Sequence, residues 1–112
     1  MVSEARRLVA GGWCQGAHAR DEAGAEVPSW SEAARSWSLL GALLASWHRQ
    51  DSQDDGDLVA HLVDAHALGH ATEVLGDVVG TAALDRWNDD SARTQADVVA
   101  AFARALERLD ET

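Results

Sequence analysis

The stretch SWSEAARSWSLLGALLASW, residues 29–47, has the most regular pattern in the chain. Ser29 and Glu32 have capping-box spacing, so we expect a helix to begin at residue 29. Leu39 and Leu43 widen the apolar face of this helix, which predicts a central element. Gly41 costs about 1 kcal/mol relative to Ala inside a helix, so we expect a close helix crossing or a packed Trp there. The apolar side chains recur at steps of three and four residues: Ala33, Trp37, Leu40, Leu44 and Trp47.

The two ends of the chain also have helical patterns. The first helix is predicted from an N-cap at Ser3 to residue 9 or 10, where Gly11 and Gly12 stop it. The last is predicted to begin at Thr94, because Asp97 follows at the capping-box position. Its inner face would consist of Ala96, Val99, Phe102, Leu106 and Leu109.

The middle of the chain is predicted as an acidic linker over residues 51–57, followed by two helices. One helix would cover residues 57–68 and end at Gly69, and the other would start near Ala71. Residues 80–81 would break or bend the second helix. The buried stripe of the helix over 57–68 would consist of Leu58, Leu62 and Ala65.

The segment GWCQGAHARDEAG, residues 12–24, separates the first two predicted helices. It is irregular, yet it holds a Trp, the single Cys, a His and an adjacent Arg-Asp pair. Loops with so many distinctive side chains commonly fold back on the domain or hold a site. Residues 21–24 are typical of a turn, and any strand is expected within a small ribbon over residues 17–28.

These patterns predict an all-α fold. A chain of 112 residues forms one domain, residues 1–112, with a core large enough to fold without staples. We therefore expect a compact bundle of four to five helices, with an ordered loop or small ribbon after the first helix.

The formal net charge of −10 limits the partners of this protein. Such a field repels nucleic acid and acidic membranes, so we expect no direct nucleic-acid binding and no membrane partner. Mimicry of a nucleic acid stays open, because the sign of the charge suits it. No apolar run is long enough to span a membrane, no signal peptide is visible, and a single Cys suits a reducing compartment. The expected location is the cytoplasm.

Cys14 is a candidate nucleophile, with His18 the nearest base in sequence and Asp21 a further candidate for acid–base chemistry. No protease signature surrounds Cys14. The alternative, a small buried side chain beside Trp13, is favoured, and we expect Cys14 to be dispensable for chemistry. No catalytic residue is assigned on this basis.

The spacing of His66, His70 and Glu73 aligns all three on one helical face, which would suit a metal ion. Gly69 lies between the two imidazoles and is expected to end the helix there. Solvated surface histidines are the favoured interpretation, and neither a metal nor a cofactor is predicted.

Two loops carry a third set of polar residues. We expect the loop after the first helix to dock against the region around Trp87 and Arg93, with Trp13 and Trp87 packed beneath the polar side chains. One interpretation is a structural network, which we favour, with Arg20 paired to Asp89 and Arg93 paired to Asp21. The other is a pocket for a small polar or anionic ligand. The polar residues are Gln15, Arg20, Asp21, Asn88, Asp89 and Arg93.

Three segments resemble an uncharacterised family of small bacterial and phage proteins, a domain of unknown function. The first is Gly-Trp-Cys-Gln-Gly-Ala at 12–17, followed by Ala-Arg-Asp at 19–21, and the second is Trp-Asn-Asp at 87–89, followed by Arg-Thr at 93–94. The third, residues 37–43, is similar to the family's Trp-Cys-x-x-Gly-Ala-Leu helix, with Ser38 where a Cys is expected. That difference weakens any mechanism needing two thiols, and the resemblance implies no activity.

The function expected from the sequence is a non-catalytic binding module for a small polar or anionic ligand or a protein partner. Its site would be the corner between residues 12–27 and residues 87–93. One alternative is a small enzyme of bacterial specialised metabolism that uses Cys14 or the polar cluster of Arg20, Asp21, Asn88 and Asp89. The other is an acidic nucleic-acid mimic. The oligomeric state stays open.

Overall fold

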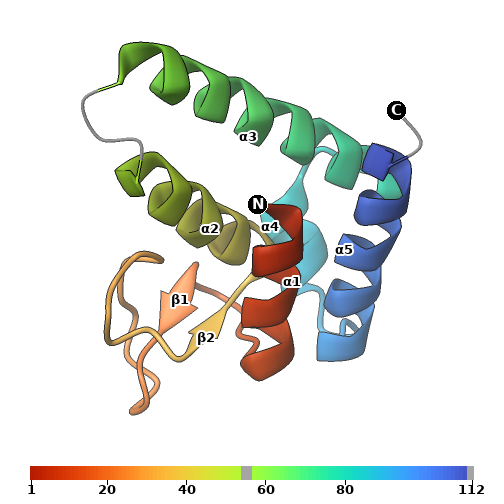
Figure 1. The fold of residues 1–112 in the computed structure, drawn as a ribbon. Helices are drawn as coiled ribbons and strands as arrows, with labels where there is room; N and C mark the ends of the chain where they lie inside the picture. The colour runs from red at the N-terminus through yellow and green to blue at the C-terminus, as the bar shows by residue number, and fades with distance from the viewer. Residues whose placement is uncertain (54–56, 111–112) are drawn as a thin grey trace.

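A computed structural model describes residues 1–53 and 57–110, without the side chains of residues 51–53. In this part of the chain it contains five helices and one two-stranded sheet, which confirms the expected all-α bundle with a small ribbon after the first helix (Figure 1). The elements are α1 (Val2–Gly11), β1 (Ala19–Arg20), β2 (Ser36–Trp37), α2 (Leu39–Gln53), α3 (Leu58–Val79), α4 (Leu84–Asp89) and α5 (Gln95–Asp110).

The core lies where α1 packs against α2 and α5, with α3 across the top of the bundle in the view of Figure 1. Each helix buries side chains spaced three and four residues apart, as an amphipathic helix must. On α5 the buried residues are Val98, Ala101, Phe102 and Ala105. This face is turned slightly from the predicted one, since Ala96 is exposed and Val99 is only partly buried.

The predicted end of the first helix and the predicted start of the last helix are confirmed, whereas the N-cap predicted at Ser3 is wrong, because α1 begins at Val2 with Met1 as its N-cap. The backbone N–H of Gly12 donates to the carbonyls of Leu8 and Val9, which closes α1. At the start of α5, the Thr94 backbone N–H donates to Asp97 Oδ2 at 3.0 Å, and the Asp97 N–H donates to Thr94 Oγ1 at 3.2 Å. This reciprocal pair is the capping box that the sequence predicted.

The predicted start of the second helix at residue 29 is wrong, because α2 begins at Leu39. Residues 28–34 form turns, and Trp37 belongs to β2. The Trp37 N–H donates to the Gly12 carbonyl at 3.0 Å, and its carbonyl accepts from the Cys14 N–H at 3.2 Å. Trp37 is therefore buried as the pattern suggested, but strand pairing has taken the backbone groups that a helix would need.

The two helices predicted between residues 57 and 80 are one. α3 covers Leu58–Val79: the carboxylate of the N-cap Asp57 accepts from the N–H groups of Val59 and Ala60, and the C-cap Gly80 has the left-handed conformation. The break at Gly80 is confirmed, but the stop at Gly69 and the new start at Ala71 are wrong. One glycine costs only about 1 kcal/mol in a helix, and this cost is outweighed by the packing of α3 before and after Gly69, at Asp64, Ala71 and Leu75.

The face that α3 buries also differs from the prediction. Its buried residues are Asp64, Ala71 and Leu75, whereas the predicted stripe of Leu58, Leu62 and Ala65 is exposed. Apolar residues lie on both sides of the first half of α3, so periodicity alone does not select the inner side. Of the predicted acidic linker, residues 51–53 belong to α2 and residues 54–56 lie outside the described residues.

Candidate functional site

Residues 12–27 fold into an ordered corner beside the start of α2 and α4. In the small sheet, Ala19 lies opposite Trp37, and Arg20 also forms a bridge with Glu26. The predicted turn at 21–24 is confirmed: Gly24 has a φ of +87°, and Asp21 Oδ1 accepts from the backbone N–H groups of residues 23 and 25. Expecting any strand only within 17–28 was wrong, because the second strand is contributed by residues 36–37.

Two glycines allow the chain to approach itself closely in this corner. A Cβ added at Gly41 would clash with the backbone carbonyl of His18, and one added at Gly12 would clash with the backbone carbonyl of Arg35. The Ser38 N–H donates to that same His18 carbonyl at 3.0 Å. Gly41 therefore accommodates the loop, rather than a helix crossing or a packed Trp.

Asn88 holds the corner together. Its side chain is fully buried, and Oδ1 accepts from Trp13 Nε1 at 2.8 Å and from the Leu39 N–H at 3.0 Å. Its amide nitrogen donates to the Cys14 carbonyl at 3.1 Å and to Asp89 Oδ1 at 3.0 Å. An Asn side chain has two donor hydrogens and two acceptor lone pairs. All four positions are therefore occupied within the fold.

Further bonds attach the loop to the end of α4. Gln15 Nε2 donates to the carbonyls of Asn88 and Asp90, both at 2.9 Å, and the Gly16 N–H donates to Asp89 Oδ1 at 2.9 Å. The predicted docking of the loop against this region is thus confirmed. The network joins residues more than 70 positions apart in the chain.

The predicted pairings of Arg20 with Asp89 and of Arg93 with Asp21 are wrong for the described structure. Arg20 donates instead to the Gln15 carbonyl through Nε and Nη2, and to the Gly24 carbonyl through Nη1. The Arg93 guanidinium lies 3.8 Å from the centre of the Trp87 ring and donates to the Trp87 carbonyl at 2.8 Å. Loop carbonyls and an aromatic face satisfy these cations locally, so neither reaches across to the other loop.

The single pocket expected at this corner is instead two clefts. On α4, Asp85 and Asp89 share a face because they are four residues apart, whereas Trp87 points about the opposite way. The acidic cleft has a volume of about 210 Å³ and is lined by Gly16, Ala17, His18, Glu26, Ser38, Asp85 and Asp89. The arginine cleft has a volume of about 240 Å³ and is lined by Val78, Val79, Trp87, Arg93, Asp97, Ala100, Ala101 and Arg104.

The acidic cleft combines three carboxylates with one imidazole. His18 Nε2 lies 3.6 Å from Asp85 Oδ2, and both side chains are about half exposed. Sequence reasoning named His18 and Asp89 but missed Glu26, Ser38 and Asp85. Asp85 could have been found, because it lies one helical turn before Asp89 in a segment already predicted to be helical.

Cys14 is buried against the loop, and its Sγ donates to the Ala17 carbonyl at 3.5 Å. Burial raises the pKa of the Cys14 thiol, and this outweighs the hydrogen bond from Ser36 and the nearby charge of Arg20, which act to lower it. The reactive thiolate is therefore disfavoured at neutral pH. Its dispensability for chemistry stays a prediction.

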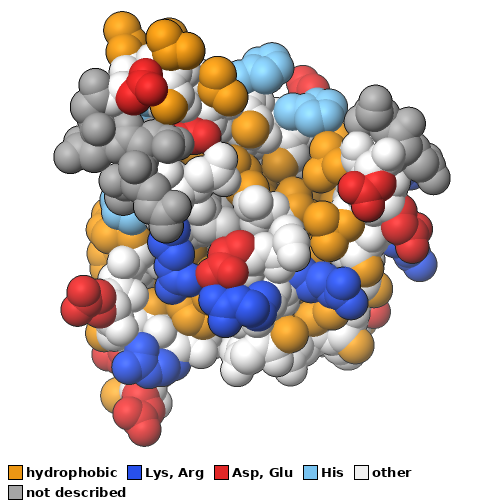
Figure 2. Space-filling model, viewed as in Figure 1, with side chains coloured by type: hydrophobic (Ala, Val, Ile, Leu, Met, Phe, Trp, Pro, Cys, Tyr) orange, Lys and Arg blue, Asp and Glu red, His pale blue; other side chains and the backbone are white. Residues whose placement is uncertain are grey.

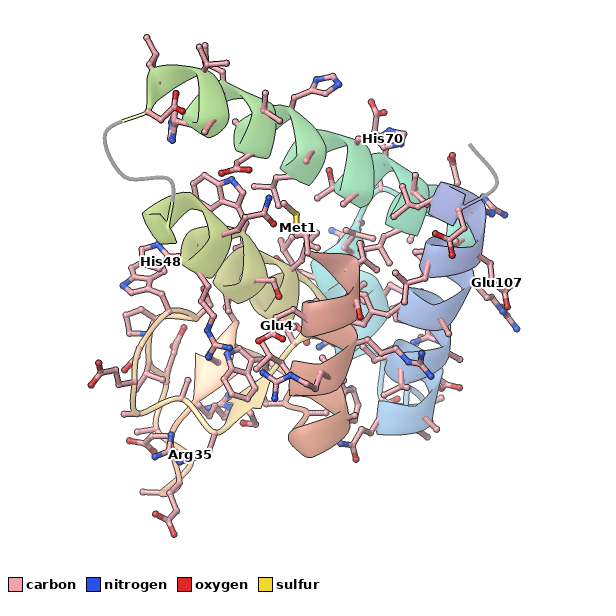
Figure 3. The ribbon with its side chains drawn as sticks, viewed as in Figure 1. Met1, Glu4, Arg35, His48, His70 and Glu107 are labelled. Atoms are coloured by element: carbon pink, nitrogen blue, oxygen red, sulfur yellow. The ribbon has the colours of Figure 1, made fainter. Side chains whose placement is uncertain are left out.

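His66, His70 and Glu73, considered as metal ligands but not favoured in that role, are all exposed on α3. The helix is unbroken at Gly69, so they do share a face, and His70 projects from the outer side of α3 (Figure 3). Within the described ranges, no three His, Cys, Asp or Glu side chains come together in a way that could hold a metal ion. Over the same ranges, none of the helices is long and apolar enough to cross a membrane.

The fold and the corner define a small, mostly helical domain whose ordered loop is attached to a short helix by a buried amide. The chain belongs to a family of unknown function (DUF6197), whose model matches residues 3–108. The match includes both loops of the corner and most or all of each described helix. Neither the curated proteins nor the solved structures contain a match to this chain.

Proposed function

We propose that this protein is a non-catalytic binding module and that the acidic cleft binds a small ligand through a positively charged group, such as an amine or guanidinium. One observation carries the proposal: three carboxylates, from Glu26, Asp85 and Asp89, line a concave site of about 210 Å³. The walls are held by the hydrogen bonds of Asn88 and Gln15. A preformed polar site of this kind orients a ligand without first ordering a loop.

The charge of the lining changes the ligand that we propose. The sequence led us to expect a small polar or anionic ligand, or a protein partner, at a corner that carries Arg20 and Arg93. Arg20 is occupied by loop carbonyls and does not line the acidic cleft, so a cation is the better match. The arginine cleft suits an anion better than the acidic cleft does, because its lining includes Arg93 and Arg104, although Asp97 lines it too.

The two alternative functions have less support from the geometry. For the enzyme, Asn88 has no free hydrogen-bonding position and the Cys14 thiol is buried with a raised pKa. The nucleic-acid mimic rests on the net charge alone. A cytoplasmic location is part of the proposal, since a lone Cys suits a reducing compartment.

The proposal is tested by titrating the ¹⁵N-labelled protein with methylguanidinium, with putrescine and, separately, with inorganic phosphate. We expect the two cations to shift the backbone amides of residues 16–18 and 26, with dissociation constants in about the millimolar range because the probes are small. Phosphate should leave those amides unchanged. Cations that shift no amide of the cleft, or that shift amides uniformly over the surface, would contradict the proposal.

Two variants separate the cleft from the general field of the protein. Asp85→Asn removes a cleft carboxylate with little change of shape, and we expect the affinity for methylguanidinium to fall at least about fivefold. Glu107→Gln removes the same charge from α5, which contributes no residue to the acidic cleft (Figure 3). Equal losses in the two variants would show that the cations respond only to the net charge.

A further inference from the structure

The first half of α3 leaves four large apolar side chains in water. Leu58, Val59, Leu62 and Val63 are exposed to 71, 70, 59 and 61%. Their spacing of one, four and five residues places them on one face, opposite the buried Asp64. Figure 2 shows apolar side chains gathered over this end of the molecule. α3 therefore packs one face against the bundle and has a second, apolar face that no described element covers.

We call this face the α3 patch (residues 58–63), and its size is comparable to that of the largest apolar patch on a typical monomer. At the measured exposures its four large side chains present on the order of 400–500 Å² of apolar surface, a size at which patches on monomers are often functional. The rest of the surface is rich in charge, since a quarter of all residues are Asp, Glu or Arg. An apolar patch in such a surface is typical of an interface.

We propose that the α3 patch is the interface of a homodimer, in which two copies of α3 pack antiparallel about a twofold axis. An axis between Ala60 and His61 places Leu58 opposite the partner subunit's Val63, and Val59 opposite the partner subunit's Leu62. Each contact between these apolar side chains then occurs twice, once on each side of the axis, as an isologous interface requires. This inference is independent of the acidic cleft, to which α3 contributes no residue.

Two features of the patch favour a second copy over another partner. The segment Leu-Val-Ala-His-Leu-Val, residues 58–63, contains no Asp, Glu or Arg, so antiparallel pairing opposes no like charges within it. Asp64 lies on the buried side of the helix. Complete burial of both patches would remove roughly 800–1,000 Å² in total, which is at or just below the lower limit for a specific interface and predicts a weak, reversible dimer.

Sedimentation equilibrium from about 5 µM to about 0.5 mM tests the proposal, and we expect a dissociation constant on the order of 10–100 µM. Because each copy carries a net charge of −10, salt should strengthen the dimer. Raising NaCl from about 20 to about 300 mM shortens the Debye length, and we expect the dissociation constant to fall at least about threefold. A chain that stays monomeric over this whole range would overturn the proposal.

Leu62→Asp should weaken the dimer at least tenfold, by placing two like charges close to the axis. Because Leu62 is exposed in the monomer, the variant should keep the helical circular dichroism of the parent. Ser91→Asp is the matched control, since it adds one negative charge in an exposed turn outside the patch and should leave the dimer unchanged. Equal weakening by both variants would contradict the assigned interface.

Concentration-dependent amide shifts locate the contact independently of any variant. We expect them to be confined to α3 around residues 58–66. Shifts centred on another element would overturn the proposal even if a dimer forms. If the chain is monomeric and a basic amphipathic peptide shifts the same amides, a foreign helix is the partner and the homodimer is excluded.

Discussion

The loop corner and the first half of α3 contrast in how their side chains are used. In the corner, Asn88 has every hydrogen-bonding position filled, and Gly12 and Gly41 leave no room for a Cβ. In α3, large apolar side chains face solvent and Gly69 has no atom within 4 Å of an added Cβ. The corner is closely specified by its own contacts, whereas the outer face of α3 is covered by no described element. Chemically distinctive residues are thus no guide to function when the fold already satisfies them.

The largest effect is expected from Gly41→Ala, because the new methyl group meets a backbone carbonyl, which cannot move as a flexible side chain can. α2 and the loop would have to separate, with loss of the bond from the Ser38 N–H to the His18 carbonyl. We expect the free energy of unfolding to fall by about 4 kcal/mol or more. Urea denaturation measures this, and a loss below about 1 kcal/mol would mean that the close approach is not required.

Asn88→Ala should have the next largest effect. It leaves Trp13 Nε1, the Leu39 N–H and the Cys14 carbonyl without their partner in a buried site. We expect a loss of about 3 kcal/mol, because each unpaired buried group costs roughly 1–3 kcal/mol and relaxation recovers part of the sum. Trp13→Phe removes only one of the four bonds and serves as the graded control, with an expected loss of about 1 kcal/mol. If both variants lose the same amount, Asn88 is not the hub of the network.

Arg20→Ala tests whether the loop itself needs its guanidinium. The change removes the donors to the Gln15 and Gly24 carbonyls, so we expect the free energy of unfolding to fall by about 1–3 kcal/mol. Arg35→Ala is the comparison, since the exposed guanidinium of Arg35 donates to carbonyls one and three residues before it (Figure 3). That variant should lose less than about 0.5 kcal/mol. Similar losses would indicate that Arg20 acts through charge rather than through the loop carbonyls.

The smallest effect, and the only gain, is expected from Gly69→Ala in α3. Nothing stands in the way of the added methyl group, and Ala is favoured over Gly in a helix interior by roughly 0.5–1 kcal/mol. Thermal denaturation at a low protein concentration, where the chain is monomeric, should show a higher midpoint. A lower midpoint would mean that this face of α3 is already occupied, and the contrast with the corner would then fail.

Local chemistry was enough to predict parts of the fold. Thr94 and Asp97 define the start of α5, and the glycines at 11 and 12 end α1, because both signals act within one helical turn. The turn at 21–24 was predicted for the same reason. The start of the second helix was mispredicted because Ser29 and Glu32 have capping-box spacing but form no cap, and because the pairing of Trp37 with Gly12 and Cys14 lies outside any local window.

Part of the candidate site was also predictable. The docking of the loop on residues 87–93 was predicted because polar and aromatic side chains so concentrated on two loops are best satisfied together. The partners of Arg20 and Arg93 were not, because a guanidinium accepts any carbonyl or aromatic face in reach. The division into an acidic and an arginine cleft depends on which way each face of the short α4 points.

The sequence by itself determined the helical class, the end of α1, the start of α5, the acidic charge and the meeting of two distant loops. Each of these follows from side-chain chemistry that acts locally or from composition. Only the tertiary structure decided that Trp37 is in a strand, that α3 is continuous through Gly69, and which side of α3 is buried. Burial is settled by the sum of contacts from the whole chain, and where two faces of a helix are both apolar, no periodicity can choose between them.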